Sequence, residues 1–148
     1  MPINLSGVPI ANNSEYEWDI YERSPVMPTY TLAMAVLSQH TSIESNIKNK
    51  TFRAWTSNAN TLVRSYNDHQ LNLNYTSSIY FFYENYFNLT DTLTKIDSLD
   101  SPRGMVDAME GWGLTIYYEG LFKSKTTLAH ELAHFWFGNR VTMSNWKK

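Results

Sequence analysis

The residues from 124 to 143 read SKTTLAHELAHFWFGNRVTM, which is the stretch of this sequence with the most specific pattern. We expect a helix here, because Ser124 or Thr126 is a suitable N-cap and Gly138-Asn139 is a suitable C-terminal stop. Apolar residues flank the polar ones along it, which is typical of a helix packed against the rest of a domain. The fold prediction therefore begins from a buried helix near the end of the chain.

This helix carries an H-E-x-x-H motif, His130-Glu131-Leu132-Ala133-His134. Residues four apart lie on one helix face, so both imidazoles can bind one metal ion. Glu131 is rotated by about 100° from His130 and is placed to act as a general base toward a water. Zinc is the expected metal, one ion per site, because neutral imidazole nitrogens suit it. The same spacing can arise by chance on a solvated helix, but the apolar flanks favour a metal site.

The two other histidines, His40 and His69, lie in polar contexts and are assigned no role. Upstream of the motif, the pattern predicts an α+β chain in which the first 40 or so residues read as β. The expected strands are Tyr30 to Leu37, Thr51 to Thr56, Thr94 to Leu99 and Leu114 to Tyr118.

A second helix is predicted between the strands near 51–56 and 94–99. Its apolar residues recur at spacings of three and four, and this stripe is expected to pack into the core. The residues of the stripe are Leu71, Tyr75, Ile79, Phe82 and Tyr86.

Composition narrows the class of protein. The 148 residues are 43% hydrophobic and 15% aromatic, which favours a packed globular segment. A net charge of −2 with no basic patch gives no reason to expect nucleic acid as a partner. We find no signal peptide and no apolar stretch long enough for a transmembrane segment. The absence of cysteine excludes disulfides and cysteine-ligated zinc.

Five N-x-S/T sequons lean mildly toward a secretory-pathway parent protein, although asparagine, serine and threonine are abundant enough for chance matches. They begin at Asn4, Asn12, Asn49, Asn74 and Asn88. The expected location is therefore membrane-anchored or secreted, facing outward, with the cytoplasm as the alternative.

The sequence resembles the M1 zinc aminopeptidases, aminopeptidase N-like gluzincins. The segment HELAHFWFGNRVTM, His130 to Met143, is close to the family's HELAH-x-WFGN-x-VTM. Asp107-Ala108-Met109-Glu110-Gly111 lies where the family has G-A-M-E-N. Further matches in the family's order are Leu5 to Ile10, Met27 to Leu32, Ile79 to Leu89, Lys95 to Asp97, and Tyr117-x-Glu119.

The resemblance implies a fold and a set of roles. Residues 1–45 would end an N-terminal β-saddle domain, and residues 46–148 would begin a thermolysin-like peptidase domain. His130 and His134 would bind zinc, and Glu131 would activate water. Ala108, Met109 and Glu110 would bind substrate, with Glu110 holding the free α-amine of a peptide. The implied substrates are peptides with a free N-terminus.

The sequence also departs from the family. Asp107 replaces a glycine, so the substrate segment gains bulk and negative charge at that end. At the other end, Gly111 replaces an asparagine. In the family the third zinc ligand is a glutamate nineteen residues after the second histidine. From His134 that spacing falls on position 153, whereas the sequence printed here ends at Lys148. We therefore expect the third ligand beyond this sequence and little activity from the chain alone.

Three hypotheses follow. The chain is part of an active zinc aminopeptidase, or an inactive truncated or degenerate relative that binds without cleaving or is only a gene fragment. The third is an unrelated α+β protein with an accidental motif, which the ordered matches disfavour.

Overall fold

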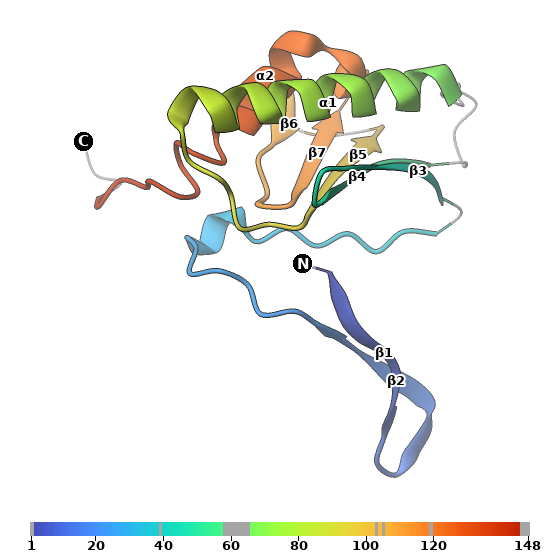
Figure 1. Cartoon of the computed structure of the whole chain (residues 1–148). Helices are drawn as coiled ribbons and strands as arrows, with labels where there is room; N and C mark the ends of the chain where they lie inside the picture. Colours follow the sequence, from blue (N-terminus) through green and yellow to red (C-terminus); the bar gives the residue numbers. More distant parts are fainter. Residues whose placement is uncertain are drawn as a thin grey trace.

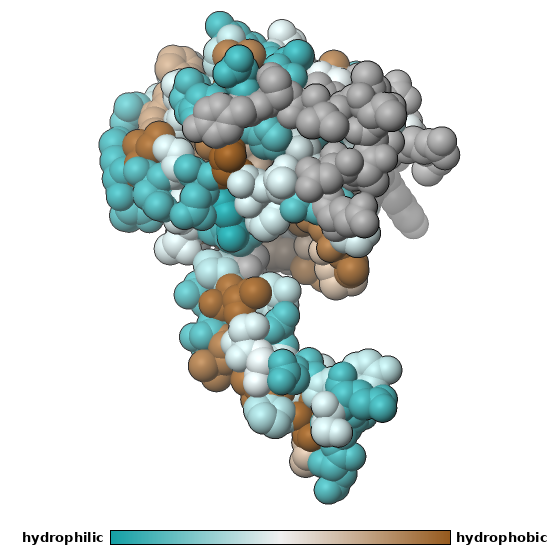
Figure 2. Space-filling model, turned by 90° about the vertical axis from the view of Figure 1, so that its right-hand side faces the viewer, coloured by the Kyte–Doolittle hydropathy of each residue, from teal (hydrophilic) through white to brown (hydrophobic). Residues whose placement is uncertain are grey.

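The chain folds as a hairpin followed by a mixed sheet with helices on one face (Figure 1). The computed structural model describes residues 2–38, 40–57, 66–102, 104, 106–118 and 120–145. Within these residues, β1 (Ile3–Ile10) and β2 (Asn13–Tyr21) form an antiparallel hairpin. The hairpin extends away from the rest of the chain and carries apolar side chains on its surface (Figures 1 and 2). Among them Tyr16 and Trp18 are 64% and 60% exposed.

The main sheet of the described residues has the order β3-β4-β5-β7-β6. Its strands are β3 (His40–Ile47), β4 (Lys50–Ser57), β5 (Lys95–Ser101), β6 (Ala108–Met109) and β7 (Leu114–Tyr118). The central pairs β4/β5 and β5/β7 are parallel, and the outer pairs β3/β4 and β6/β7 are antiparallel. The α+β class is confirmed, and so are the strands predicted within β4, β5 and β7.

Two helices of the described chain, α1 (Tyr66–Phe87) and α2 (Lys125–Ala133), cover the same face of this sheet (Figure 1). Phe52 and Ala54 point toward them from β4 and have no exposed surface. The rings of Phe52 and Tyr80 pack edge to face with centroids 5.8 Å apart. Side chains alternate along a strand, so the alternation predicted for Thr51 to Thr56 is confirmed with Phe52 on the core side.

The apolar stripe predicted for α1 is only partly correct. Phe82 and Tyr86 are 60% and 72% exposed, whereas Leu73 and Tyr80 are buried. The buried face also includes polar residues, some of which hydrogen-bond to distant parts of the chain. For example, Asn72 Nδ2 donates to the carbonyl of Phe122 at 2.6 Å. Such satisfied polar groups allow the helix to rotate away from its most apolar side.

The strand predicted at Tyr30 to Leu37 is wrong. A 3-10 helix, η1 (Thr29–Thr31), begins the segment, and residues 32–37 follow without regular structure. Leu32 is extended, and side chains alternate beyond it, with Met34 84% exposed and Ala33 less exposed. A strand also requires a ladder of backbone pairs with a neighbouring strand, and among the described residues no strand pairs with this segment, which runs under the sheet opposite α1 (Figure 1). One backbone hydrogen bond, from the N–H of Trp112 to the carbonyl of Thr31 at 3.0 Å, holds its first residues.

The expected domain boundary near residue 45 falls inside β3, which pairs with β4 along its whole length. The division into a β-saddle and a thermolysin-like domain stays a prediction. No helix in the described part of the chain is long and apolar enough to span a bilayer.

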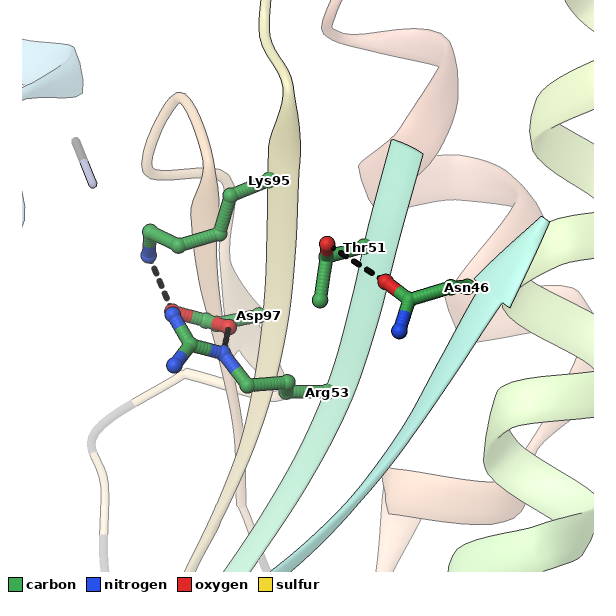
Figure 3. A network of polar contacts seen from close by, with 5 residues as sticks. All are labelled: Asn46, Thr51, Arg53, Lys95 and Asp97. Carbon is green, nitrogen blue, oxygen red and sulfur yellow. Dashed lines mark hydrogen bonds and ion pairs between the residues drawn. The ribbon is translucent and has the colours of Figure 1, made fainter. Parts of the chain in front are cut away.

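The sheet face opposite α1 carries a charged network (Figure 3). Asp97, which is 5% exposed, accepts a hydrogen bond from Arg53 Nε at 2.8 Å and also pairs with Lys95. At the β3/β4 pair, Thr51 Oγ1 donates to Asn46 Oδ1 at 2.7 Å. Arg53 and Asp97 are paired in register between parallel strands, so this ion pair ties β4 to β5.

We predict that Asp97→Asn lowers the free energy of unfolding by about 1.5–3 kcal/mol, the range for hydrogen bonds to charged groups. The measurement is urea denaturation at neutral pH. The matched control is Asp68→Asn, because Asp68 pairs with Lys123 at a more exposed position, 3.1 Å away. That variant should change stability by less than about 1 kcal/mol. Equal losses in the two variants would show that the network contributes no more than a surface pair.

Candidate active site

Helix α2 begins at the Ser124 cap. The Ser124 side chain accepts a hydrogen bond from the backbone N–H of Thr127, which decides between the two predicted caps in favour of Ser124. Leu128 and Leu132, one turn apart, have no exposed surface. Burial of these two side chains fixes the rotation of the helix about its axis. Residues on its other side therefore face away from the core and can contact a metal or a substrate.

The regular helix ends at Ala133, earlier than the predicted stop at Gly138-Asn139. His134 keeps helical backbone angles as the C-cap, and the chain then tightens into a turn. The N–H of Trp136 donates to the carbonyl of Ala133 at 3.1 Å, which is a three-residue spacing. Gly138 follows with φ of 120°, a conformation that L side chains rarely adopt.

The structure brings the two predicted metal ligands together. Nε2 of His130 and Nε2 of His134 lie 3.3 Å apart, with the rings nearly perpendicular at 87°. Two nitrogens bound to one tetrahedral zinc at about 2.0–2.1 Å would lie about 3.3 Å from each other. Both side chains are accessible to solvent. The pair therefore fits zinc without rearrangement of the ring nitrogens.

The described residues contain no group of three histidine, cysteine or acidic side chains arranged around one point. Two imidazoles are thus the metal donors that this part of the chain offers.

Glu131, the predicted general base, is 5% exposed. Burial raises the pKa of its carboxyl above the ordinary value of 4.5, and the negative charges of Glu110 and Asp107 add to the shift. Charge on His130 or His134 acts in the opposite direction. A carboxylate with a raised pKa is a stronger base than an ordinary one, so this largely buried group is suited to take up a proton.

The predicted substrate segment lies beside α2. Strand β6, Ala108 and Met109, pairs antiparallel with β7 at the edge of the sheet, and Glu110 follows directly. Met109 is 44% exposed. The side-chain amide of Asn139 donates to the carbonyl of Glu110 at 3.3 Å. The predicted residues are thus gathered at one place, and Glu119 lies outside the described residues.

Gly111, which departs from the family pattern, stands in a space that no side chain fits. A β-carbon added there would lie 2.4 Å from the carbonyl oxygen of Leu114 and 2.5 Å from the β-carbon of Ala33. Both distances are far shorter than a van der Waals contact. The asparagine of the family pattern would therefore require this backbone to move.

The sequence predicts no role at this site for Tyr117, for Asn139 or for the backbone of Phe137, whose side chain is expected to add to a dry, apolar helix surface but is 58% exposed. Tyr117 on β7 has no exposed surface, and burial raises the pKa of its phenol, with the Glu131 carboxylate adding to the effect. Alternation along Leu114 to Tyr118 would place Tyr117 inside, but not beside Glu131. Phe137 contributes its backbone carbonyl, which lies 3.0 Å from Nδ1 of His134. The identity of a residue does not indicate where its backbone carbonyl will point.

Comparison with known proteins gives consistent matches. The Peptidase family M1 domain matches residues 71–148. Aminopeptidase N of Bos taurus is 35% identical over 99% of this chain, and aminopeptidase Q of Homo sapiens is 32% identical over 97%. The thyrotropin-releasing hormone-degrading ectoenzyme of Rattus norvegicus is 30% identical over 98%. The chain spans 16%, 16% and 15% of the length of these relatives, respectively.

We predict that Glu131→Gln stabilises the metal-free protein at pH 7. The folded-state pKa is raised, so the folded state binds the proton more tightly and loses stability as pH rises from 4.5 through the raised pKa. The neutral amide escapes this loss, and the difference from wild type should vanish below about pH 4, where both states are protonated. The measurement is urea denaturation with a chelator at several pH values.

The matched control for this prediction is Glu44→Gln on β3, where the side chain is exposed. Its stability should stay within about 0.5 kcal/mol of wild type. A Glu131→Gln protein that is less stable than wild type at neutral pH would show that the buried carboxylate is favourably paired.

Proposed function

The chain belongs to peptidase family M1, and from that premise we propose that it supplies the metal-binding helix and the amine-binding segment of a zinc aminopeptidase. The observation that carries the proposal is the pair of imidazole Nε2 atoms 3.3 Å apart beside a buried glutamate. The expected reaction is hydrolysis of the first peptide bond of a peptide with a free N-terminus.

His130 and His134 would hold the zinc ion. Zinc, when bound, lowers the pKa of a water molecule and polarises a carbonyl. Glu131 would accept the proton of the attacking water and pass it to the leaving amine, since the raised pKa of its carboxyl suits both steps. Its low exposure, 5%, keeps bulk water away from that proton.

Glu110 would bind the substrate α-amine, because a carboxylate makes strong charge-assisted hydrogen bonds to an ammonium group. Ala108 and Met109 form the last strand of the described sheet, and the outer edge of such a strand can pair with an extended peptide. A peptide held there would run toward the imidazole pair, with its N-terminus at Glu110.

A second candidate is a family member that binds peptides without cleaving them. Asp107 in place of the glycine favours it, because the added side chain brings bulk and negative charge to the substrate segment. Zinc content and turnover distinguish the two functions.

We predict that the protein binds one zinc ion and that His130→Ala or His134→Ala abolishes tight binding. Each substitution removes one of the two donors, and a single imidazole does not hold the ion. The measurement is zinc content by atomic emission after dialysis, with His40→Ala as control, since Nδ1 of His40, on β3, lies 2.6 Å from the carbonyl of Ser38 and away from the imidazole pair. Undiminished zinc in both variants would contradict the site.

We predict that Glu131→Gln keeps the zinc and lowers the rate of cleavage of aminoacyl reporter substrates by about 10²–10⁴-fold, the range for a lost general base. Equal rates in wild type and variant would refute the assigned base. Zinc and peptide binding without any turnover in wild type would instead support the non-cleaving alternative.

A further inference from the structure

We propose that the turn Phe137–Asn139 is a positioning element that holds His134 and Glu110 at once. The carbonyl of Phe137 would select the tautomer of His134, and the side chain of Asn139 would fix the backbone of Glu110. The inference rests on the proposed function, because that function assigns His134 to a metal and Glu110 to a substrate amine.

The first half concerns the imidazole. Nδ1 of His134 lies 3.0 Å from the carbonyl oxygen of Phe137. A carbonyl only accepts hydrogen bonds, so Nδ1 must carry the proton. Nε2 is then the nitrogen with the lone pair, and it is the atom 3.3 Å from Nε2 of His130. Metal-binding histidines are commonly oriented by such a hydrogen bond on the other nitrogen.

Gly138 makes this carbonyl geometry possible. Its φ of 120° is strained for residues with a β-carbon. A β-carbon there would also lie 3.0 Å from the hydroxyl of Tyr30 and 3.2 Å from Nδ1 of His134. Any larger residue would therefore press on the imidazole and on the N-terminal segment that carries Tyr30.

The second half concerns Asn139, which is 2% exposed. Its backbone N–H donates to the carbonyl of His134 at 3.0 Å, and its side-chain amide donates to the carbonyl of Glu110 at 3.3 Å. One residue thus links the end of α2 to the end of β6. These two hydrogen bonds join the backbone of His134 to the backbone of Glu110.

The Oδ1 atom of Asn139 is buried without a hydrogen-bond partner among the residues described. An unsatisfied buried acceptor lowers stability. Stability alone therefore does not explain an amide at this position, whereas the contact with Glu110 does.

The Phe137 half is tested by NMR of nitrogen-15 histidine in the zinc-free protein at about pH 8, where imidazole is neutral. His134 should carry its proton on Nδ1, although free imidazole side chains prefer Nε2. Gly138→Ala should lose this preference and bind zinc about 10–100-fold more weakly. A proton on Nε2 in the wild type overturns this half, and that measurement stands even if the variant fails to fold.

The control for Gly138→Ala is Gly7→Ala in the hairpin, where φ is 68° and the strain of an added β-carbon falls far from the site. It should leave the tautomer of His134 and the zinc affinity unchanged. A loss of the tautomer preference in the Gly7 variant would show that general destabilisation, not the turn, sets the imidazole.

The Asn139 half is tested by the affinity of the zinc-loaded protein for L-leucinamide, a small ligand with a free α-amine. Asn139→Ala should bind it about tenfold more weakly, the equivalent of one lost hydrogen-bonded contact, with zinc affinity unchanged within about threefold. Asn85→Ala, an exposed position on α1, is the control. Wild-type leucinamide affinity in Asn139→Ala overturns this half.

Glu110→Gln separates the inference from the proposed function. If Glu110→Gln weakens leucinamide binding and Asn139→Ala does not, the amine-binding role of Glu110 stands and the positioning role of Asn139 is refuted. If it leaves leucinamide affinity unchanged, the amine site of the proposed function is refuted, while the tautomer of His134 still decides the Phe137 half.

Discussion

The rotation of α2 about its own axis is the constraint on which the site depends. Leu128, Leu132 and Phe135 have no exposed surface, so the helix can present only one face to the sheet and α1. Residues two positions from Leu128 and Leu132 point roughly the opposite way, and these are His130 and His134. Glu131 lies between the two faces and is 5% exposed, near enough to Tyr117 of β7 for its charge to raise the pKa of that phenol. If α2 were rotated by half a turn about its axis, His130 and His134 would be buried and Leu128 and Leu132 would be exposed.

Three hydrogen bonds tie α1 and the residue shortly after it to α2 and its flanking segments. Asn72 of α1 binds the Phe122 carbonyl just before α2, and the hydroxyl of Tyr83 donates to the carbonyl of Ala129 at 3.1 Å in its middle. After α2, the indole N–H of Trp136 donates to the carbonyl of Leu89 at 2.9 Å. These hydrogen bonds orient a short helix whose own propensity would not suffice.

Sequence was sufficient where local periodicity decides the outcome. The spacing of His130 and His134 predicted their convergence, and the alternation of Thr51 to Thr56 predicted a half-buried strand; the structure confirms both. Prediction failed where the outcome depends on distant partners. The segment from Tyr30 to Leu37 has strand-like composition but no neighbouring strand in the described chain, and the buried face of α1 was decided by hydrogen bonds.

The positioning atoms of the site were beyond sequence reasoning for a different reason. The carbonyl of Phe137 and the N–H of Asn139 are backbone groups that nearly every residue type supplies. No pattern of residue types therefore predicts their contacts. Their effect depends on the turn after Ala133, which was predicted as helix. From the sequence pattern, Gly138 is expected only to end a helix.

The proposed function requires that two imidazoles, His130 and His134, bind one zinc ion in the arrangement that the protein already holds. The most direct measurement is zinc X-ray absorption fine structure on the protein loaded with one equivalent of zinc. The account predicts two imidazole nitrogens at about 2.0–2.1 Å with the outer-shell scattering of the rings. A spectrum that lacks imidazole scattering, or that shows a single ring, would contradict it.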